Sequence, residues 1–136
     1  MIKDINILTG IDIVKISRIE NILNKYKKEF VNSVYSEDEI AYCESHKNNA
    51  SLYAVRFAAK EAGSKALGLG IDGITITYKD IEVTKADNGK PNIQFHGNAK
   101  CILKNMGNYK ASLSLSHDGD YAVAYVAILV YESVDD

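Results

Sequence analysis

The spacing of hydrophobic residues alternates along this chain between a strand-like period of two and a helical period. Apolar residues occupy every second position through most of 5–14, INILTGIDIV, which predicts a strand. Residues 16–30 follow at helical spacing, with an apolar stripe formed by Ile16, Ile19, Leu23, Tyr26 and Phe30. A stripe of this kind predicts a helix that turns one face toward a core.

Two further helices are predicted before the middle of the chain. Residues 36–46 begin with a capping box, in which Ser36 caps the helix and Glu39 reaches back to it. Residues 51–70 are rich in good helix formers and end at Gly68 and Gly70, which tolerate the backbone of a helix C-terminus.

The second half of the chain returns mostly to strands. Strands are predicted at 74–78, 81–86, 92–96, 111–117 and 121–131. A helix is predicted at 98–106, and tight turns at 87–89 and 118–120. These elements predict an α+β fold, with helices packed on an antiparallel sheet, in a single domain over residues 1–136.

Composition narrows the class of protein. The chain has 136 residues, a net charge of −2 and a pI near 5.9, so it is no electrostatic match for nucleic acid. No apolar run reaches the roughly 18 residues of a membrane span, and no leader is evident, so we expect a cytoplasmic protein without a membrane segment. Cys43 and Cys101 fit no metal-ligand spacing, and we expect two reduced, buried thiols.

The helix at 51–70 carries charges in an unusual pattern. Arg56 and Lys60 are four residues apart, as are Glu61 and Lys65, so three cations surround one carboxylate. Solvated ion pairs are one interpretation, and a phosphate-binding face with a metal ligand is the other. Alanines keep the neighbouring surface low, which predicts that something large approaches this helix, at positions 54, 58, 59, 62 and 66.

Two other charged features allow a functional and a structural interpretation. Asp12 lies in an apolar strand, and an unpaired buried carboxylate costs several kcal/mol, so it faces water, a cation or a metal. On the helix at 16–30 a cationic stripe surrounds one apolar residue; its members are Lys15, Arg18, Ile22 and Lys25. This stripe is either an ordinary solvated face or a docking surface for an acidic helix.

Four segments of the chain resemble one known family. Residues 10–19 resemble its G-[IV]-D-[IL]-V-x-x-x-R-[IL] opening, and residues 56–68 its [RW]-[FT]-A-x-K-E-A-x-x-K-A-[LF]-G helix. Residues 88–91 are similar to its N-G-K-P turn, and residues 114–117 to its [SV]-[IL]-[ST]-H strand. The family is that of the holo-acyl-carrier-protein synthases, the short-chain 4′-phosphopantetheinyl transferases.

The resemblance implies a reaction, a cofactor and an assembly. Members transfer 4′-phosphopantetheine from coenzyme A to a serine of apo-acyl carrier protein and release adenosine 3′,5′-bisphosphate. The holo-acyl carrier protein that results serves fatty acid biosynthesis. The resemblance also implies Mg²⁺ and a homotrimer with active sites between subunits.

The resemblance assigns roles to individual residues. Asp12 and Glu61 are the expected Mg²⁺ ligands, and with Lys65, which would stabilise charge on the leaving side, they form the expected catalytic set. The expected coenzyme A contacts are Arg56, Lys60, Lys65, Gly68, Gly89, Lys90, Pro91, Ser116 and His117. Arg18 matches the family's carrier-protein arginine, and the stripe extends that surface to Lys15, Ile22 and Lys25.

Some questions stay open at the level of sequence. The general base is either Glu61 acting through a water on the metal, or a carboxylate of the carrier protein. A non-catalytic module that binds carrier protein or nucleotide, and a structural trimer with the charged helix at a subunit contact, are the alternatives to an enzyme. A pure binding module has no need of Asp12, so the metal pair distinguishes the first alternative from the transferase.

Overall fold

A computed structural model describes residues 1–134 and confirms the α+β class. Its elements are, in order, β1 (Ile2–Lys15), α1 (Ile16–Val34), α2 (Glu37–Glu44), α3 (Ala50–Ala66), the 3₁₀ helix η1 (Tyr78–Asp80), β2 (Ile81–Lys85), β3 (Pro91–Phe95), α4 (Gly97–Met106), β4 (Asn108–Asp118) and β5 (Tyr121–Ser133). The domain predicted over 1–136 includes Asp135 and Asp136, which lie outside the described residues. Among residues 1–134, none of the helices is both long and apolar enough to cross a bilayer.

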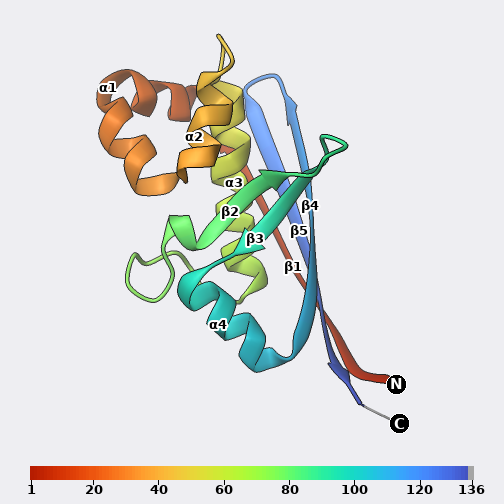
Figure 1. Cartoon of the computed structure of the whole chain (residues 1–136). Coiled ribbons are helices and arrows are strands. Elements are labelled where there is room, and N and C mark those ends of the chain that lie inside the picture. Colours follow the sequence, from red (N-terminus) through yellow and green to blue (C-terminus); the bar gives the residue numbers. More distant parts are fainter. Residues whose placement is uncertain (135–136) are drawn as a thin grey trace.

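The strands form two antiparallel sheets. One has the order β1-β5-β4, and the other is the β2–β3 hairpin. The helix α3 packs against β1 and β5, while α1 and α2 lie together at one end of the molecule (Figure 1). Both termini lie at the opposite end, where β1 and β5 extend beyond the rest of the fold (Figure 1). Helices therefore cover one face of the larger sheet.

The contact between α3 and β1 depends on a glycine. A Cβ built on Gly10 would lie 1.9 Å from the carbonyl oxygen of Ala62 and 2.8 Å from the backbone nitrogen of Ala66. Five alanines of α3 are buried, at positions 54, 58, 59, 62 and 66. The large partner predicted to approach this low surface is thus the protein's own sheet.

Four residues of the predicted stripe on α1 face the core, namely Ile16, Ile19, Leu23 and Phe30, and Tyr26 does not. Ile19 and Leu23 are buried, but Tyr26 is 61% exposed and has non-helical backbone angles at a kink. Beyond the kink the buried positions are Val31 and Val34. Tyr26 lies at the kink itself, so the uniform helical spacing that placed it in the core does not apply there.

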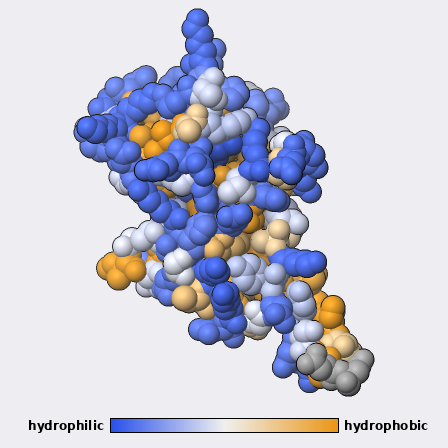
Figure 2. Space-filling model, viewed as in Figure 1, coloured by the Kyte–Doolittle hydropathy of each residue, from blue (hydrophilic) through white to orange (hydrophobic). Residues whose placement is uncertain are grey.

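The strand predicted at 74–78 is wrong. The carboxylate of Asp72 accepts hydrogen bonds from the backbone N–H groups of residues 74, 75 and 76 at 2.9, 2.7 and 3.1 Å. These bonds lower the pKa of Asp72 to about 2 and fold the segment into a turn. The turn leaves Ile74 91% exposed, and Figure 2 shows a hydrophobic spot where this loop protrudes.

The two cysteines are free but differ in burial. Cys43 is buried on α2, and burial raises the pKa of its thiol to about 11. Cys101 is exposed on α4, so the prediction that both thiols are buried is wrong for this residue. The apolar face of α4 consists instead of Ala99 and Leu103.

A buried ion pair joins α3 to α2. The Lys60 ammonium lies 2.9 Å from the Glu39 carboxylate, and both side chains are fully buried. The same ammonium donates to the backbone oxygens of Tyr78 and Ile81 at 3.1 and 2.6 Å. Glu39 completes the predicted capping box with Ser36 and accepts a further bond from the Val83 N–H. Burial lowers the pKa of Lys60, although Glu39 opposes that shift.

Gly10→Ala tests the helix–strand contact. We expect the free energy of unfolding to fall by at least about 1–3 kcal/mol, because the added methyl meets backbone atoms that cannot move independently. Gly70→Ala is the matched control, since a Cβ there meets nothing within 4 Å. Equal urea midpoints for the two variants would show that β1 and α3 are not in close contact.

Lys60→Met tests the buried pair. We expect a loss of about 3–5 kcal/mol in the free energy of unfolding, because Glu39 is left charged and buried without its cation. The double variant Lys60→Met/Glu39→Gln should recover part of this loss, and Lys79→Met on the exposed face of η1 should change little. A double variant as unstable as the single one argues against a paired charge.

Candidate active site

Asp12 occupies the side of β1 that faces α3. It pairs in register with Ala124, which is buried, whereas its neighbours Ile11 and Ile13 are more than half exposed on the other side. The Asp12 side chain is 18% exposed, and its Oδ1 lies 3.0 Å from the Lys65 ammonium. That ammonium also donates to the Ile11 carbonyl oxygen at 2.9 Å. The structure thus brings two of the three predicted catalytic residues into direct contact.

Glu61 lies one turn before Lys65 on α3 and is half-buried. Its Oε1 accepts a hydrogen bond of 2.7 Å from the Tyr78 hydroxyl. Burial, followed by this bond, raises the pKa of Tyr78, and the charge of Asp12 adds to the rise. Tyr78 therefore remains a protonated donor to Glu61.

The number and type of acidic side chains at this site fit a magnesium ion. Mg²⁺ keeps several waters and commonly takes only one or two carboxylates together with substrate phosphates. Within residues 1–134 there is no group of three or more His, Cys, Asp or Glu side chains able to hold a metal ion. Asp12 and Glu61 are two carboxylates on the neighbouring elements β1 and α3, the number and type that such a site takes, and Lys65 pairs with Asp12.

A hollow of about 380 Å³ opens beside these charges. Its lining consists of Ile11, Asp12, Ile13, Lys65 and Val123. Apart from Asp12 and Lys65 this lining is hydrophobic, which suits an uncharged chain next to a charged group.

The three cations of α3 do not converge as the sequence predicted. Lys65 reaches Asp12, whereas Lys60 points into the core toward Glu39. The predicted contact of Lys60 with coenzyme A is therefore wrong, because its side chain is inaccessible and its ammonium donates to three protein oxygens. Lys60 and Lys65 are five residues apart, which at 3.6 residues per turn places them on different faces of the helix.

Arg56 lies in a different hollow from Lys65. It is 4% exposed, its guanidinium lies 4.5 Å from the centre of the Tyr42 ring, and it donates to the Leu52 carbonyl at 3.1 Å. Its Nε has no hydrogen-bond partner among the described residues. Lys85 lies over the same ring at 4.1 Å, so two cations flank Tyr42.

The other predicted coenzyme A contacts are dispersed, but the hollow of Ser116 and His117 shares Ile13 and Val123 with the hollow beside Asp12. Ser116 and His117 are exposed near the end of β4 and line a shallow hollow with Tyr121. Gly89 and Lys90 are exposed in the β2–β3 turn, and Pro91 begins β3. Gly68 ends α3 with a φ of +76°, where glycine is favoured. Only Gly68 adjoins the helix that carries Glu61 and Lys65.

The predicted carrier-binding stripe is accessible. Lys15, Arg18 and Lys25 are exposed, and Ile22 is half-buried among them. The start of α1 is held by Asp120, whose carboxylate accepts bonds from the Ser17 backbone and hydroxyl at 2.9 and 2.5 Å. The stripe therefore has a fixed position relative to the β4–β5 turn.

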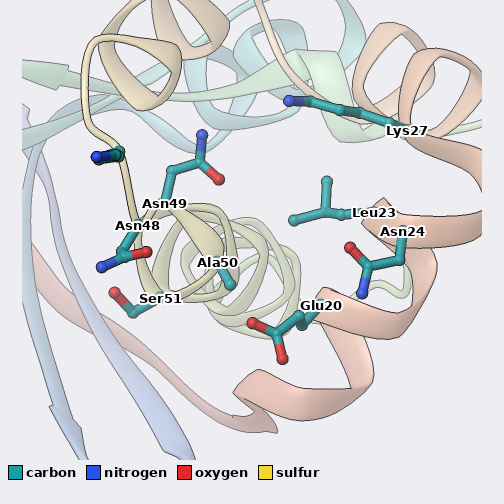
Figure 3. A pocket seen from close by; sticks show the side chains of 9 residues that line it. Glu20, Leu23, Asn24, Lys27, Asn48, Asn49, Ala50 and Ser51 are labelled. Carbon is teal, nitrogen blue, oxygen red and sulfur yellow. The ribbon is translucent and has the colours of Figure 1, made fainter.

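A separate polar pocket lies between α1 and the loop that precedes α3. Figure 3 shows its lining, which includes Glu20, Asn24 and Lys27 on one side and Asn48, Asn49 and Ser51 on the other. None of the predicted site residues lines it.

Tyr78 is the site residue that sequence reasoning missed. It lay in a segment predicted to be a strand, and its hydroxyl touches Glu61 only because η1 folds back onto α3. A tyrosine in an apolar run gives no signal of such a contact.

Comparisons with known proteins agree on one family. Residues 9–126 match the family model of the 4′-phosphopantetheinyl transferase superfamily. A holo-[acyl-carrier-protein] synthase of Clostridium acetobutylicum is 42% identical over 122 residues, which cover 90% of this chain and 96% of that protein.

Solved structures of similar proteins have the same fold. The holo-[acyl-carrier-protein] synthase of Neisseria meningitidis has a TM-score of 0.80 at 30% identity, over 89% of this chain and 96% of that one. That of Helicobacter pylori, in complex with coenzyme A, has a TM-score of 0.72 at 33% identity, over 92% and 100%. Since sequence and fold agree over nearly the whole chain, the protein belongs to the 4′-phosphopantetheinyl transferase superfamily.

Proposed function

We propose that this protein is a holo-[acyl-carrier-protein] synthase. It transfers 4′-phosphopantetheine from coenzyme A to a serine of apo-acyl carrier protein, in the cytoplasm and for fatty acid biosynthesis. The serine oxygen bonds to the phosphorus that carries pantetheine, and the pyrophosphate P–O bond breaks to release adenosine 3′,5′-bisphosphate. The observation that carries the proposal is a charged cluster in a chain of this family: Asp12 pairs with Lys65, and Glu61 lies one turn before Lys65 on α3.

Each member of the cluster has chemical work in this reaction. Asp12 and Glu61 would hold Mg²⁺, which when bound offsets negative charge on the pyrophosphate. Lys65 is exposed enough to exchange Asp12 for a phosphate oxygen, and it neutralises charge on the leaving group. The serine proton passes to a base, for which Glu61 through water and a carboxylate of the carrier are the two candidates.

Coenzyme A binding extends beyond the cluster. The pantetheine arm fits the apolar hollow beside Asp12. Arg56, in a hollow that Tyr42 and Lys85 also line, keeps its expected role as a contact to a coenzyme A phosphate. Gly68 borders the cluster, and the remaining contacts, supplied by a neighbouring subunit, are Gly89, Lys90, Pro91, Ser116 and His117. The acidic carrier protein docks on the stripe defined by Lys15, Arg18, Ile22 and Lys25.

An uncovered apolar sheet face supports a homotrimer. Opposite α3, exposed hydrophobic side chains lie on two strands of the larger sheet, with Thr9 among them: Ile5, Ile7, Ile11, Ile13, Tyr121, Tyr125 and Leu129. A contiguous face of this kind is rare on a monomer and marks an interface. Ser116 lies on the same face, beside Val123 in register, so association would place it near a neighbour.

Mass spectrometry of apo-acyl carrier protein tests the function. The carrier is incubated with this protein, coenzyme A and Mg²⁺, and we expect it to gain the mass of one phosphopantetheine. A carrier that stays unmodified at every metal and coenzyme A concentration would refute the transferase.

Asp12→Asn and Glu61→Gln test the metal pair. We expect each to lower the transfer rate at least about 100-fold, because a metal ion supplies several kcal/mol of charge stabilisation in the transition state. Thermal melting should change little, since both side chains keep their shape. Glu37→Gln, exposed in the first turn of α2, is the control. Near-normal transfer by either site variant would remove that residue from the metal site.

Leu129→Lys tests the assembly. Sedimentation should find a trimer for the unaltered protein and smaller species for the variant, because a charge is costly in an apolar interface. Transfer should fall together with the trimer, since the site needs two subunits. A monomeric variant with full activity would contradict shared sites.

A further inference from the structure

We infer that Tyr78 is a positioning residue that orients Glu61 for its metal ion. This inference rests on the proposed metal role of Glu61. A carboxylate that binds a metal through one oxygen is commonly held by a hydrogen bond at the other, and such partners set metal affinity. The Tyr78 hydroxyl occupies that position, 2.7 Å from Oε1.

The geometry leaves one oxygen of Glu61 available. Oε1 accepts the Tyr78 hydroxyl, and no hydrogen bond to Oε2 is present among residues 1–134. Lys65, the nearby cation, is engaged with Asp12 and not with Glu61. The bond to Tyr78 thus fixes the rotation of the carboxylate and directs Oε2 toward a ligand.

Tyr78 is itself held from two sides. Its ring stacks on Phe57 with centroids 5.3 Å apart and planes inclined by 28°. Its backbone oxygen accepts from the Lys60 ammonium, which the buried Glu39 fixes in turn. The hydroxyl therefore reaches Glu61 from a rigid base, which is what a positioning group requires.

The stack of Tyr78 on Phe57 also lies near the proposed carrier-binding stripe, so loss of the stack and loss of the hydroxyl should have different effects. The Arg18 guanidinium lies 6.0 Å from the Phe57 ring, on the side of the proposed carrier-binding stripe. A change that merely disturbed the stack would alter Arg18 and the KM for carrier protein. Removal of the hydroxyl alone should weaken the metal site and leave that KM unchanged.

Tyr78→Phe removes the hydroxyl and keeps the ring. Calorimetric titration with Mn²⁺ should show a Kd raised about 10-fold or more. Loss of a hydrogen-bond partner of a metal ligand commonly has an effect of this size. The KM for apo-acyl carrier protein should stay unchanged, while the Mg²⁺ concentration for half-maximal transfer rises. Tyr109→Phe is the matched control, because that hydroxyl has no hydrogen bond among the described residues and its ring packs on Phe95.

A spectroscopic measurement on the unaltered protein does not depend on whether any variant folds. The protein has no tryptophan, so its near-ultraviolet absorbance comes largely from tyrosine. Addition of Mg²⁺ should polarise the Tyr78 hydroxyl through Glu61 and produce a tyrosine difference spectrum in the unaltered protein and in Tyr109→Phe. Tyr78→Phe should lack it.

The outcomes separate this inference from the proposed function. Equal Mn²⁺ affinities for Tyr78→Phe and the unaltered protein, or no Mg²⁺-induced tyrosine spectrum in the unaltered protein, would overturn the role of Tyr78 alone. Absence of cation binding by the unaltered protein would overturn the metal assignment together with this inference. Absence of transfer in the carrier assay, with Mn²⁺ still bound, would refute the transferase but not the role of Tyr78.

Discussion

The close approach of α3 to β1 is the constraint on which the site depends. Gly10 has no side chain, so the strand lies against the backbone of Ala62. Asp12 follows two residues later and points to the same side of the sheet, while Glu61 and Lys65 flank Ala62 on the helix. A larger residue at position 10 would separate the two elements that carry the acids. The close contact of Gly10 with Ala62 therefore also sets how near Asp12 lies to the charged residues of α3.

A second arrangement fixes the remaining side of the site. A buried ion pair is costly to form and costly to break, and it stabilises only when its hydrogen bonds are complete. Lys60 meets this condition through Glu39 and two backbone oxygens, one of which belongs to Tyr78. The position of η1, and with it the tyrosine beside Glu61, is thus set from inside the core. This explains a charged residue at the centre of an otherwise apolar helix face.

Much of the fold follows from periodicity alone. Alternating residues predicted β1, β4 and β5, and the capping box at Ser36 predicted the start of α2. Three predictions about the fold failed for physical reasons that the spacing of residues does not show. Tyr26 sits at a kink, and the segment that includes Ile74 is turned by the carboxylate of Asp72. Position 101 was expected to be buried, but α4 turns that face outward.

The site was less predictable than the fold. Asp12 is an acid in an apolar strand and belongs to a family motif. These two features were enough to predict that it lies near the helix at 51–70. Nothing in an i,i+4 pattern tells a buried lysine from an exposed one, so Lys60 and Lys65 looked equivalent although only Lys65 lies at the site. Tyr78 could not be found from spacing, because its contact depends on a chain reversal between α3 and η1.

The central claim concerns where a metal ion binds. Crystals grown with Mn²⁺ and adenosine 3′,5′-bisphosphate would locate the ion by its anomalous scattering. The account predicts one ion in contact with a carboxylate oxygen of Asp12 and with Oε2 of Glu61, beside a phosphate of the nucleotide and the Lys65 ammonium. An ion bound elsewhere, with Asp12 still paired only to Lys65, would contradict it.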